Sequence, residues 1–434
     1  MSTIKKETDI GGKVRTVAVV GGGAAGLMAA IRAAENGARV LLFERNDRLG
    51  RKLRITGKGR CNVTNCCDRS EFLANVSTNP RFLYAALAAM EPADTMEFFE
   101  GLGVPLKTER GRRVFPVSDR ADDIADALAR RCRELRVSVL RARVSAVLTA
   151  DGKVTGIRTE QGEYAADAVI LCTGGRSYPK TGSDGDGYRM ARELGHTITP
   201  VRPSLVPLVE RGTLCAEMQG LSLRNIGFRV ADRTNGKTVY DDFGELLFTH
   251  FGLSGPVALS ASAHLSEITP DRYEAQIDLK PALNVEKLNA RLLSDFGKYA
   301  NRDFANALGD LLPQKMIAPM VRLSGVDPHK KVHSVTREER ERLIGLFKCF
   351  RVPLGGLRPI EEAIVTRGGV SVKEVDPGTM ASRLVAGLWF AGEILDVDAY
   401  TGGFNLQIAF STATLAGVHA AAGAEKSFLH PKGS

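Results

Sequence analysis

The clearest hydrophobic pattern lies close to the N-terminus. Val17–Val20 is a short apolar run of the kind that forms a buried parallel strand. Three glycines follow at 21–23, and an alanine-rich stretch then predicts a helix that ends near Asn36. A second apolar run, Arg39–Phe43, predicts another strand, which ends on Glu44. Together these elements predict a βαβ unit.

Helical and strand-like patterns alternate further along the chain. Helical spacing of apolar residues covers Pro80–Gly101 and Asp119–Leu135, and Ser118 with Asp119 is the predicted N-cap of the second helix. From Val137 to Thr173 the pattern becomes strand-like and predicts a β-meander, whose last strand runs into a Thr-Gly-Gly turn.

The pattern changes again after about His196. Alternation at Ile226, Phe228 and Val230 predicts one strand of a hairpin with an Asn-Gly turn. Helical patterns follow at Val285–Tyr299, Phe304–Leu311 and Thr336–Phe350. We therefore expect residues 197–355 to form an insertion of mixed strands and helices.

The C-terminal part returns to the character of the first unit. A short apolar strand at Leu388–Ala391 is followed by Gly392 and Glu393, a loop, and a helix from about Asn405. The fold class expected is α/β, with a Rossmann-type domain completed by both ends of the chain. The predicted divisions are a tail at 1–14, a discontinuous nucleotide-binding domain at 15–196 and 356–424, the insertion at 197–355, and a tail at 425–434.

Composition is that of an ordinary globular protein, with 44% hydrophobic and 25% charged residues among 434. Lys and Arg number 59 against 50 Asp and Glu, and this positive charge favours contact with phosphates. The seven cysteines have no regular spacing, which argues against a disulfide framework and predicts a reducing compartment, the cytoplasm. No metal site and no membrane span are expected, since neither ligand spacing nor a long apolar run is found.

The glycines after the first strand carry the strongest chemical signal. Gly21-x-Gly23-x-x-Gly26, with Ala24 and Ala25 between, lies between a predicted strand and a helix. Such a loop allows a tight turn, close approach of backbone to a pyrophosphate, and close packing of helix on strand. Glu44 ends the second strand where a carboxylate accepts hydrogen bonds from an adenosine ribose. We expect the Arg45 side chain to point to the opposite side of Glu44.

A long dinucleotide that touches distant segments is FAD rather than NAD. We expect Glu393 to bind ribityl or pyrophosphate-side hydroxyls, and Gly402 and Gly403 to allow backbone to approach the flavin ring. The start of the last helix would place N–H groups near the pyrimidine edge. The two ends of the chain would then meet around one cofactor. Further expected cofactor contacts are Arg45, Cys61, Val144, Thr173, Gly174, Gly175, Gly392, Asn405, Leu406 and Gln407.

The chain resembles the BaiN/YhiN-type flavoprotein family from Val17 to about Ala420. The resemblance rests on the strings VVGGGAAG, GRKLRITGKGRCNVTN, LCTGGRSYPKTGSDGDGY, LLFTHFGLSGP and GLWFAGEILDVDAYTGGFNLQIAFSTATLAG. It implies a glutathione-reductase-like FAD domain that carries an inserted β-barrel and helical region, with FAD bound non-covalently.

The resemblance also implies a role for the loop at 51–65. In this fold the loop lies along the pyrophosphate and ribityl chain. The two glycines, Gly57 and Gly59, would permit close approach of backbone to the cofactor. Arg51, Lys52 and Arg60 would offset phosphate charge, and Asn62 and Asn65 would supply amides. For Cys61 we favour structural packing over catalysis, because a redox thiol normally needs a nearby partner.

Candidate acid–base groups are fewer. His250 can titrate near neutrality, although a histidine satisfied within the insertion is an equally good interpretation. Tyr400 precedes the glycine pair and either donates to a substrate carbonyl or packs as a ring. Tyr178, Arg113 and Arg367 are weaker candidates for the substrate side.

Family resemblance implies three activities. They are reduction of an activated C=C bond, including those of oxo-bile acids, reduction of a uridine in ribosomal RNA to dihydrouridine, and flavin-dependent amine oxidation. Both reductions pass a hydride from reduced flavin N5 to an electron-poor carbon. We favour a small-molecule C=C reductase with NADH or NADPH as donor, and keep RNA as an alternative partner. The substrate and the oligomeric state stay open.

Overall fold

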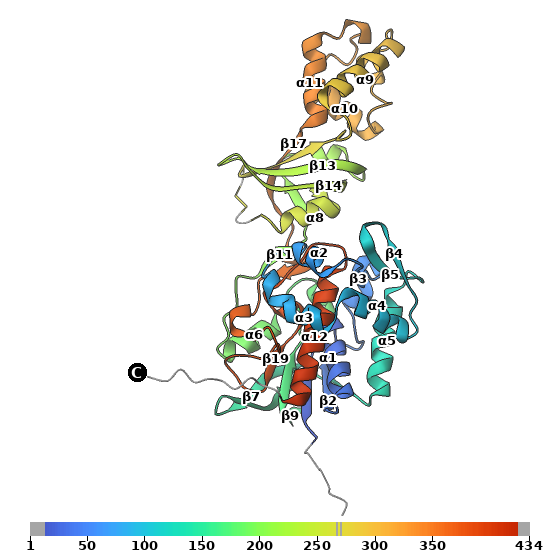
Figure 1. Cartoon of the computed structure of the whole chain (residues 1–434). Coiled ribbons are helices and arrows are strands. Elements are labelled where there is room, and N and C mark those ends of the chain that lie inside the picture. Colours follow the sequence, from blue (N-terminus) through green and yellow to red (C-terminus); the bar gives the residue numbers. More distant parts are fainter. Residues whose placement is uncertain (1–13, 266–267, 270, 424–434) are drawn as a thin grey trace, which may run out of the picture. The chain divides into compact units, whose positions relative to one another are not determined.

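The computed structural model describes residues 14–265, 268–269 and 271–423, and it divides the chain into two compact units (Figure 1). Unit 1 comprises the described residues up to Arg202 and from Val365 onward, and unit 2 is Pro203–Ile364. The expected tails, 1–14 and 425–434, lie outside the described residues except for position 14.

The chain passes between the units after Arg202 and after Ile364, whereas the sequence predicted divisions at 196/197 and 355/356. Strand β17, Phe350–Leu357, pairs with β16, Tyr273–Asp278, inside unit 2. A division after residue 355 would cut through this strand. The correction follows from sheet pairing, which a hydrophobic pattern along one strand does not reveal.

Unit 1 is built on a five-stranded parallel sheet in the order β19-β10-β1-β2-β6. Its central strand, β1, is Thr16–Val20, whose last four residues are buried. This explains why its sequence is continuously apolar rather than alternating. The other strands are β2 (Arg39–Glu44), β6 (Ser138–Arg141), β10 (Ala168–Leu171) and β19 (Leu388–Phe390).

Two helices from opposite ends of the chain pack together against this sheet. Helix α1 is Ala24–Glu35 and helix α12 is Phe404–Ala422 (Figure 1). A Cβ atom on Gly417 would lie 2.6 Å from the carbonyl oxygen of Ala29, so glycine is needed for this close contact. Most of α12 is buried, which accounts for its apolar character on all sides.

The expected helix Pro80–Gly101 is interrupted. It consists of the 3₁₀ turn η2 (Pro80–Leu83), α3 (Tyr84–Ala89) and α4 (Pro92–Gly101). The break precedes a proline, which disfavours helical backbone in the residue before it.

The N-cap expected for the next helix is also corrected. Helix α5 is Ala121–Glu134 and its N-cap is Arg120, because Asp119 adopts a left-handed conformation with φ 57°.

Smaller sheets and turns complete unit 1. The predicted meander is confirmed for its middle part, an antiparallel sheet of three strands, β7 (Val144–Ala150), β8 (Lys153–Thr159) and β9 (Gly162–Ala165). The first and last strands of the predicted range, β6 and β10, instead pair in parallel within the central sheet. A second antiparallel sheet has the order β3-β5-β4. The remaining elements are η1 (Leu53–Gly59), β3 (Thr64–Asn65), α2 (Arg69–Ala74), β4 (Leu106–Glu109), η3 (Arg110–Arg112), β5 (Arg113–Pro116), η4 (Pro179–Thr181), α6 (Asp186–Glu193), β18 (Val365–Arg367), η8 (Val372–Glu374) and η9 (Gly392–Ile394).

Unit 2 contains the closed β-barrel that the resemblance implies. Its strand order is β12-β15-β14-β13-β16-β17, and Phe228, Phe248 and Phe350 are fully buried in its core. The remaining barrel strands are β12 (Leu208–Glu210), β13 (Ser222–Asp232), β14 (Lys237–Thr249) and β15 (Gly252–Ser254).

The helices of unit 2 agree only in part with the expectation. Two of them, α9 (Val285–Lys298) and α11 (Arg337–Lys348), were expected. The third, α10 (Gln314–Ser324), was not predicted, because it contains Pro319 and a proline within a segment argues against a helix there. The expected helix Phe304–Leu311 is only the short turn η5 (Phe304–Asn306). The chain enters this unit at the start of β11 (Arg202–Ser204). The unit's other elements are α7 (Leu214–Glu217), α8 (Pro256–Ser262), η6 (Val332–Ser334) and η7 (Ile360–Glu362).

No helix in the described ranges is both long and apolar enough to cross a bilayer.

Candidate cofactor site

The glycine loop between β1 and α1 has the geometry of a phosphate cradle. Gly21 has φ 102°, and a Cβ atom on Gly26 would lie 1.7 Å from the Gly21 carbonyl oxygen. Gly23 is the N-cap of α1, and a Cβ atom placed there would meet no atom within 4 Å. The first turn of α1 thus begins beside open space at Gly23, and the N–H groups of Ala24 and Ala25 are the groups expected to meet a diphosphate.

Glu44 lies at the carboxyl end of β2 and reaches back to this loop. Its Oε2 accepts a hydrogen bond of 2.7 Å from the Gly22 N–H, and its Oε1 accepts from the N–H and the side-chain amide of Asn46, at 2.8 and 2.7 Å. A carboxylate offers about four acceptor positions. The three bonds within the described residues therefore leave Oε2 able to accept a ribose hydroxyl.

Glu393 lies in η9, three residues after the end of β19. Its Oε1 accepts from the Ser177 hydroxyl at 3.0 Å and from the Thr366 N–H at 2.9 Å. Its Oε2 accepts from the Lys52 ammonium at 2.7 Å, and Lys52 also donates to Ser177 at 2.7 Å. Glu393 thus also accepts three hydrogen bonds from described residues, and Oε2 again has capacity for a hydroxyl.

The Gly402–Gly403 turn brings the start of α12 onto the N-terminal half of the unit. Gly403 has φ 99°, and a Cβ atom on it would lie 2.3 Å from the Thr64 carbonyl oxygen. The Asn65 amide donates to the carbonyl oxygens of Gly402 and Gly111, each at 3.0 Å. The two ends of the chain therefore meet at this turn, as expected from the sequence.

Comparison with known proteins identifies the family. Residues 15–419 match the model of the HI0933-like protein Rossmann domain. The chain belongs to the HI0933-like family. It is 32% identical, over 93% of its length and 98% of the relative's, to the 3-dehydro-bile acid delta(4,6)-reductase of Clostridium scindens. It is also 32% identical to the ribosomal RNA dihydrouridine synthase of Escherichia coli, over 91% of this chain and 95% of that one.

Solved structures agree on the fold. The 3-ketosteroid delta1-dehydrogenase of Sterolibacterium denitrificans aligns with a TM-score of 0.51 at 14% identity, covering 94% of this chain and all of that one. The predicted BaiN/YhiN-type family is confirmed, and the HI0933-like chain is an FAD-dependent oxidoreductase.

Buried polar atoms in the HI0933-like chain test whether its residues suit FAD. Within the described ranges, the side-chain oxygens of Asn62 and Thr173 are buried and have no hydrogen-bond partner. Both residues were expected to contact the cofactor. Since unpaired buried acceptors and hydroxyls are costly, they fit a site in which a bound group supplies the missing partners.

Other glycines of the expected site lie where a side chain would collide. A Cβ atom on Gly175 would be 2.3 Å from the Thr366 hydroxyl, and one on Gly174 would be 2.7 Å from the Ser183 hydroxyl. Gly392 has φ 78°, and a Cβ atom on it would be 2.7 Å from that of Ala25. These glycines keep the backbone of three segments close together.

The loop after β2 bends through consecutive left-handed residues. Gly57, Lys58 and Gly59 have φ of 57°, 59° and 83°, and Cys61 has φ 59°. The Cys61 side chain is fully buried, and burial raises the pKa of its thiol to about 12, a shift partly opposed by a hydrogen bond with Thr56. This environment supports packing rather than thiolate chemistry for Cys61.

Two basic residues of this loop bind carboxylates. The Lys52 ammonium is bound to Glu393 and Ser177, and its role in offsetting phosphate charge stays a prediction. Arg60 donates to Asp119 at 2.9 Å and to Glu109 at 3.3 Å, and these hydrogen bonds raise the pKa of its guanidinium. Its charge is therefore neutralised by carboxylates.

Arg45 and Arg51 lie on the outer side of the site. The Arg45 guanidinium is 2.7 Å from Asp184 and 3.2 Å from Asp186, and its contact with the cofactor stays a prediction. Arg51 donates to the side-chain oxygen of Asn46 at 3.2 Å and so orients a partner of Glu44.

Predicted contacts at the start of α12 are only partly supported. Gln407 is fully buried, and its side-chain amide bonds to Thr64, Met90 and Ser411, so its partners lie inside the protein and its contact with the cofactor stays a prediction. The Asn405 side chain binds the backbone of Ala399 and Tyr400, which leaves its N–H in the first helical turn as the group to meet a ligand.

Three further predicted residues are placed as follows. Leu406 is half-buried one residue later in that turn, Val144 is the buried first residue of β7, and Tyr400 is half-buried with its N–H bound to the Asn75 carbonyl oxygen at 3.0 Å. A contact of each with cofactor or substrate stays a prediction.

The predicted acid–base residue His250 lies in unit 2. It is exposed just after β14, with its ring centroid 5.0 Å from that of Phe251, and its catalytic role stays a prediction.

Sequence reasoning missed Asn46, Ser177 and Thr366. Asn46 follows Glu44 by two residues, a spacing typical of short-range side-chain capping. Thr366 precedes Glu393 by 27 residues without a pattern that joins them.

Proposed function

We propose that this HI0933-like protein reduces a C=C bond conjugated to a carbonyl group in a small molecule, with FAD as hydride carrier and NADH or NADPH as donor. The relative from Clostridium scindens, which matches nearly the whole chain, is named for reduction of such bonds. The seven cysteines are free, which fits a reducing compartment such as the cytoplasm.

The paired arrangement of Glu44 and Glu393 carries this proposal. Both follow strands of one parallel sheet, and ligands of such sheets bind at the carboxyl ends of the strands. The Glu44 carboxylate would bind the adenosine ribose and the Glu393 carboxylate a hydroxyl of the ribityl chain. The first turn of α1 would hold the diphosphate between them.

The ring end would be held by the backbone at Gly402 and Gly403. Bound there, FAD supplies reversible hydride chemistry, which no side chain provides. The N–H groups that begin α12 would stabilise negative charge at the ring edge. Reduction of a C=C bond also needs one proton, for which His250 and Tyr400 are the candidate sources.

Spectroscopy of the purified protein tests the proposal directly. We expect a flavin absorption spectrum, loss of that absorption on anaerobic addition of NADH or NADPH, and its return when a steroid enone is added. The saturated steroid serves as control, since it cannot accept the hydride. A reduced flavin that no enone reoxidises would contradict the proposal.

A second candidate function is reduction of a uridine in ribosomal RNA, since uracil also contains a C=C bond conjugated to a carbonyl. An arginine-rich tip of the β4–β5 hairpin favours it. Arg110, Arg112 and Arg113 are exposed there, and Asn65 joins the tip to Gly402 through the carbonyl oxygen of Gly111. A basic surface beside the proposed ring end would suit RNA phosphates.

Binding and product assays distinguish the two candidates. RNA reduction requires binding of a ribosomal RNA fragment that weakens steeply between 50 and 200 mM salt, together with dihydrouridine in the product. We expect the triple substitution R110Q/R112Q/R113Q to abolish that binding if RNA is the substrate. Efficient enone reduction without RNA binding would favour the small-molecule function.

A further inference from the structure

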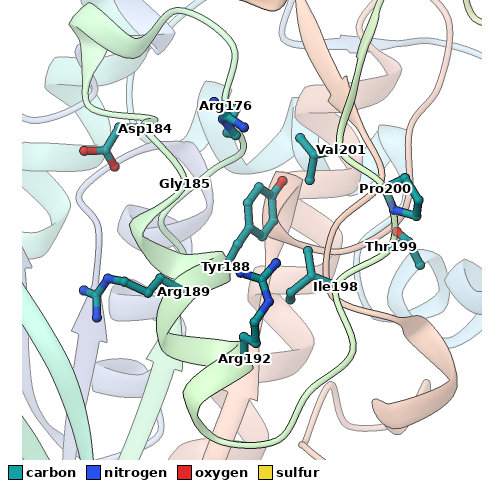
Figure 2. A pocket seen from close by; sticks show the side chains of 10 residues that line it. All are labelled: Arg176, Asp184, Gly185, Tyr188, Arg189, Arg192, Ile198, Thr199, Pro200 and Val201. Atoms are coloured by element: carbon teal, nitrogen blue, oxygen red, sulfur yellow. The ribbon is translucent and has the colours of Figure 1, made fainter.

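A hollow of about 340 Å³ opens on the surface of unit 1 (Figure 2). It belongs to no contact that the sequence predicted. Its lining comes from the segment after β10, from α6 and from the chain that follows it: Arg176, Asp184, Gly185, Tyr188, Arg189, Arg192, Ile198, Thr199, Pro200 and Val201.

Two of the arginines in this lining are available to a ligand. Arg176 and Arg192 are exposed, and within the described ranges neither side chain pairs with a carboxylate. Arg189, in contrast, donates to Glu193 at 2.8 Å and to the Ser145 carbonyl oxygen at 2.9 Å.

The negative charge at the rim is already neutralised. Asp184 is 2.7 Å from Arg45 and 3.5 Å from Arg143. Figure 2 shows the side chains of Asp184 and Arg189 directed away from the Tyr188 ring. The hollow therefore presents an excess of positive charge to an entering group.

An apolar wall lies between the two free guanidiniums. The Tyr188 ring is 4% exposed and stands between Arg176 and Arg192, with Ile198 and Val201 beside it (Figure 2). Such a surface suits a ring that carries an anionic group, because the half-buried side chains of Ile198 and Val201 can cover the ring while guanidiniums bind the anion.

Residues of helix α6 beside the hollow also contact segments of the proposed flavin site. The Tyr188 hydroxyl donates to the backbone carbonyl oxygen of Glu393 at 3.4 Å, and a Cβ atom on Gly187 would lie 1.9 Å from the Thr173 hydroxyl and 2.8 Å from Ile394. Residues of α6 thus pack directly behind the segments expected to hold FAD.

We propose that this hollow binds the adenosine 2′-phosphate of NADPH, with Arg176 and Arg192 on the phosphate and Ile198 and Val201 against the adenosine. The inference deepens the proposed function, since it rests on a nicotinamide donor. In that reaction NADPH loses a hydride, which carries two electrons, to the flavin and becomes NADP⁺. A phosphate monoester carries close to two negative charges, which two guanidiniums match, and NADH lacks this group.

Binding of 2′,5′-ADP to the FAD-loaded protein tests the proposal by calorimetry. This fragment contains the 2′-phosphate but cannot transfer a hydride. We expect R176Q and R192Q each to weaken its binding about tenfold, as for loss of one charge-assisted hydrogen-bonding partner. The KM for NADPH should rise by a similar factor while kcat changes little.

The substitution R130Q is the matched control, because it removes the same charge from an exposed arginine of α5 that donates to the Leu102 carbonyl oxygen. It should bind 2′,5′-ADP as the parent does. Equal affinity of the parent for 2′,5′-ADP and 5′-AMP, parent-like binding by both hollow variants, or equally tight binding of inorganic phosphate would each overturn the proposal. Since binding needs no enone, loss of C=C reduction with intact 2′,5′-ADP binding would contradict only the proposed function.

Discussion

Glu44 and Glu393 resemble each other in position but differ in how they are held. Each follows a strand of the central sheet, and each accepts three hydrogen bonds from described residues. The donors to Glu44 are neutral and lie 2 and 22 residues away in sequence. One donor to Glu393 is the Lys52 ammonium, 341 residues away.

The difference separates a local part of the site from a long-range part. Around Glu44, one βαβ unit supplies the loop, the helix and the carboxylate. Around Glu393, the side chains of Lys52 and Ser177 and the backbone of Thr366 come from three other segments and meet the carboxylate only in the folded chain. A cation beside Glu393 also makes that part of the site more sensitive to loss of one partner, because an unpaired buried charge is costly.

The largest expected effect comes from the substitution Gly26→Ala in the glycine loop between β1 and α1. A Cβ atom there would lie 1.7 Å from the Gly21 carbonyl oxygen, so α1 and the loop must separate. We expect a loss of unfolding free energy of at least about 3 kcal/mol and no bound flavin. Denaturant unfolding and the flavin-to-protein absorbance ratio measure both.

Gly101→Ala is the control for this change, because a Cβ atom on that helical glycine would meet no atom within 4 Å. Its stability should equal or exceed that of the parent. A stable, yellow Gly26→Ala protein would show that the close contact is dispensable.

The contacts of Glu393 are tested by Lys52→Met, which keeps the approximate length of the side chain and removes its charge. Glu393 would lose its cation, and we expect FAD to bind 10- to 100-fold more weakly, or about 1.4–2.8 kcal/mol. Fluorescence titration of the apoprotein with FAD gives the dissociation constant. Lys153→Met is the matched control, since it makes the same substitution at an exposed lysine of β8 that has no role in the proposed site.

A double-mutant cycle sharpens the same test. Adding Glu393→Gln to Lys52→Met removes the uncompensated charge, so the double variant should bind FAD more tightly than the two single effects predict. Strictly additive effects would mean that the two side chains do not interact energetically.

The contact between the buried His196 and Ser382 predicts an effect of pH on stability that is intermediate in size. Burial lowers the pKa of His196, against the opposing influence of Glu374, and its Nε2 lies 2.8 Å from the Ser382 hydroxyl. Below pH 6.5 the unfolded chain therefore binds a proton that the folded state resists, so stability falls as pH falls. The slope should approach at most about 1.4 kcal/mol per pH unit.

Urea unfolding between pH 7.5 and 5.0 measures this slope. His196→Gln should lower stability at pH 7.5 and flatten the dependence above pH 5, where most carboxylates stay ionised. An unchanged slope in the variant would assign the effect to other groups.

The smallest expected effect concerns Cys61. Its thiol is buried with a pKa raised to about 12, so Cys61→Ala should leave the rate of flavin reduction by NADPH or NADH unchanged within about twofold. In the native protein only Cys66, which is exposed, and the half-buried Cys349 should react with a thiol reagent. Rapid labelling of Cys61 or loss of flavin reduction would instead support a redox role.

Sequence alone determined the βαβ unit, the Gly21–Gly26 loop and the position of Glu44. The reason is that these features depend on contacts within about 30 residues, where hydrophobic spacing and glycine placement report directly on geometry. The glycine pair at 402–403 could be recognised for the same reason.

Only the tertiary structure decided which partners the charged and amide side chains take. Lys52 binds Glu393, and Arg60 pairs with Glu109 and Asp119. Gln407 is buried in the core, where it bonds to Thr64 and Met90. Each choice depends on side chains brought together by sheet order and helix packing. A linear pattern identifies which residues can bind a cofactor, whereas burial and competing partners determine which of them remain free to do so.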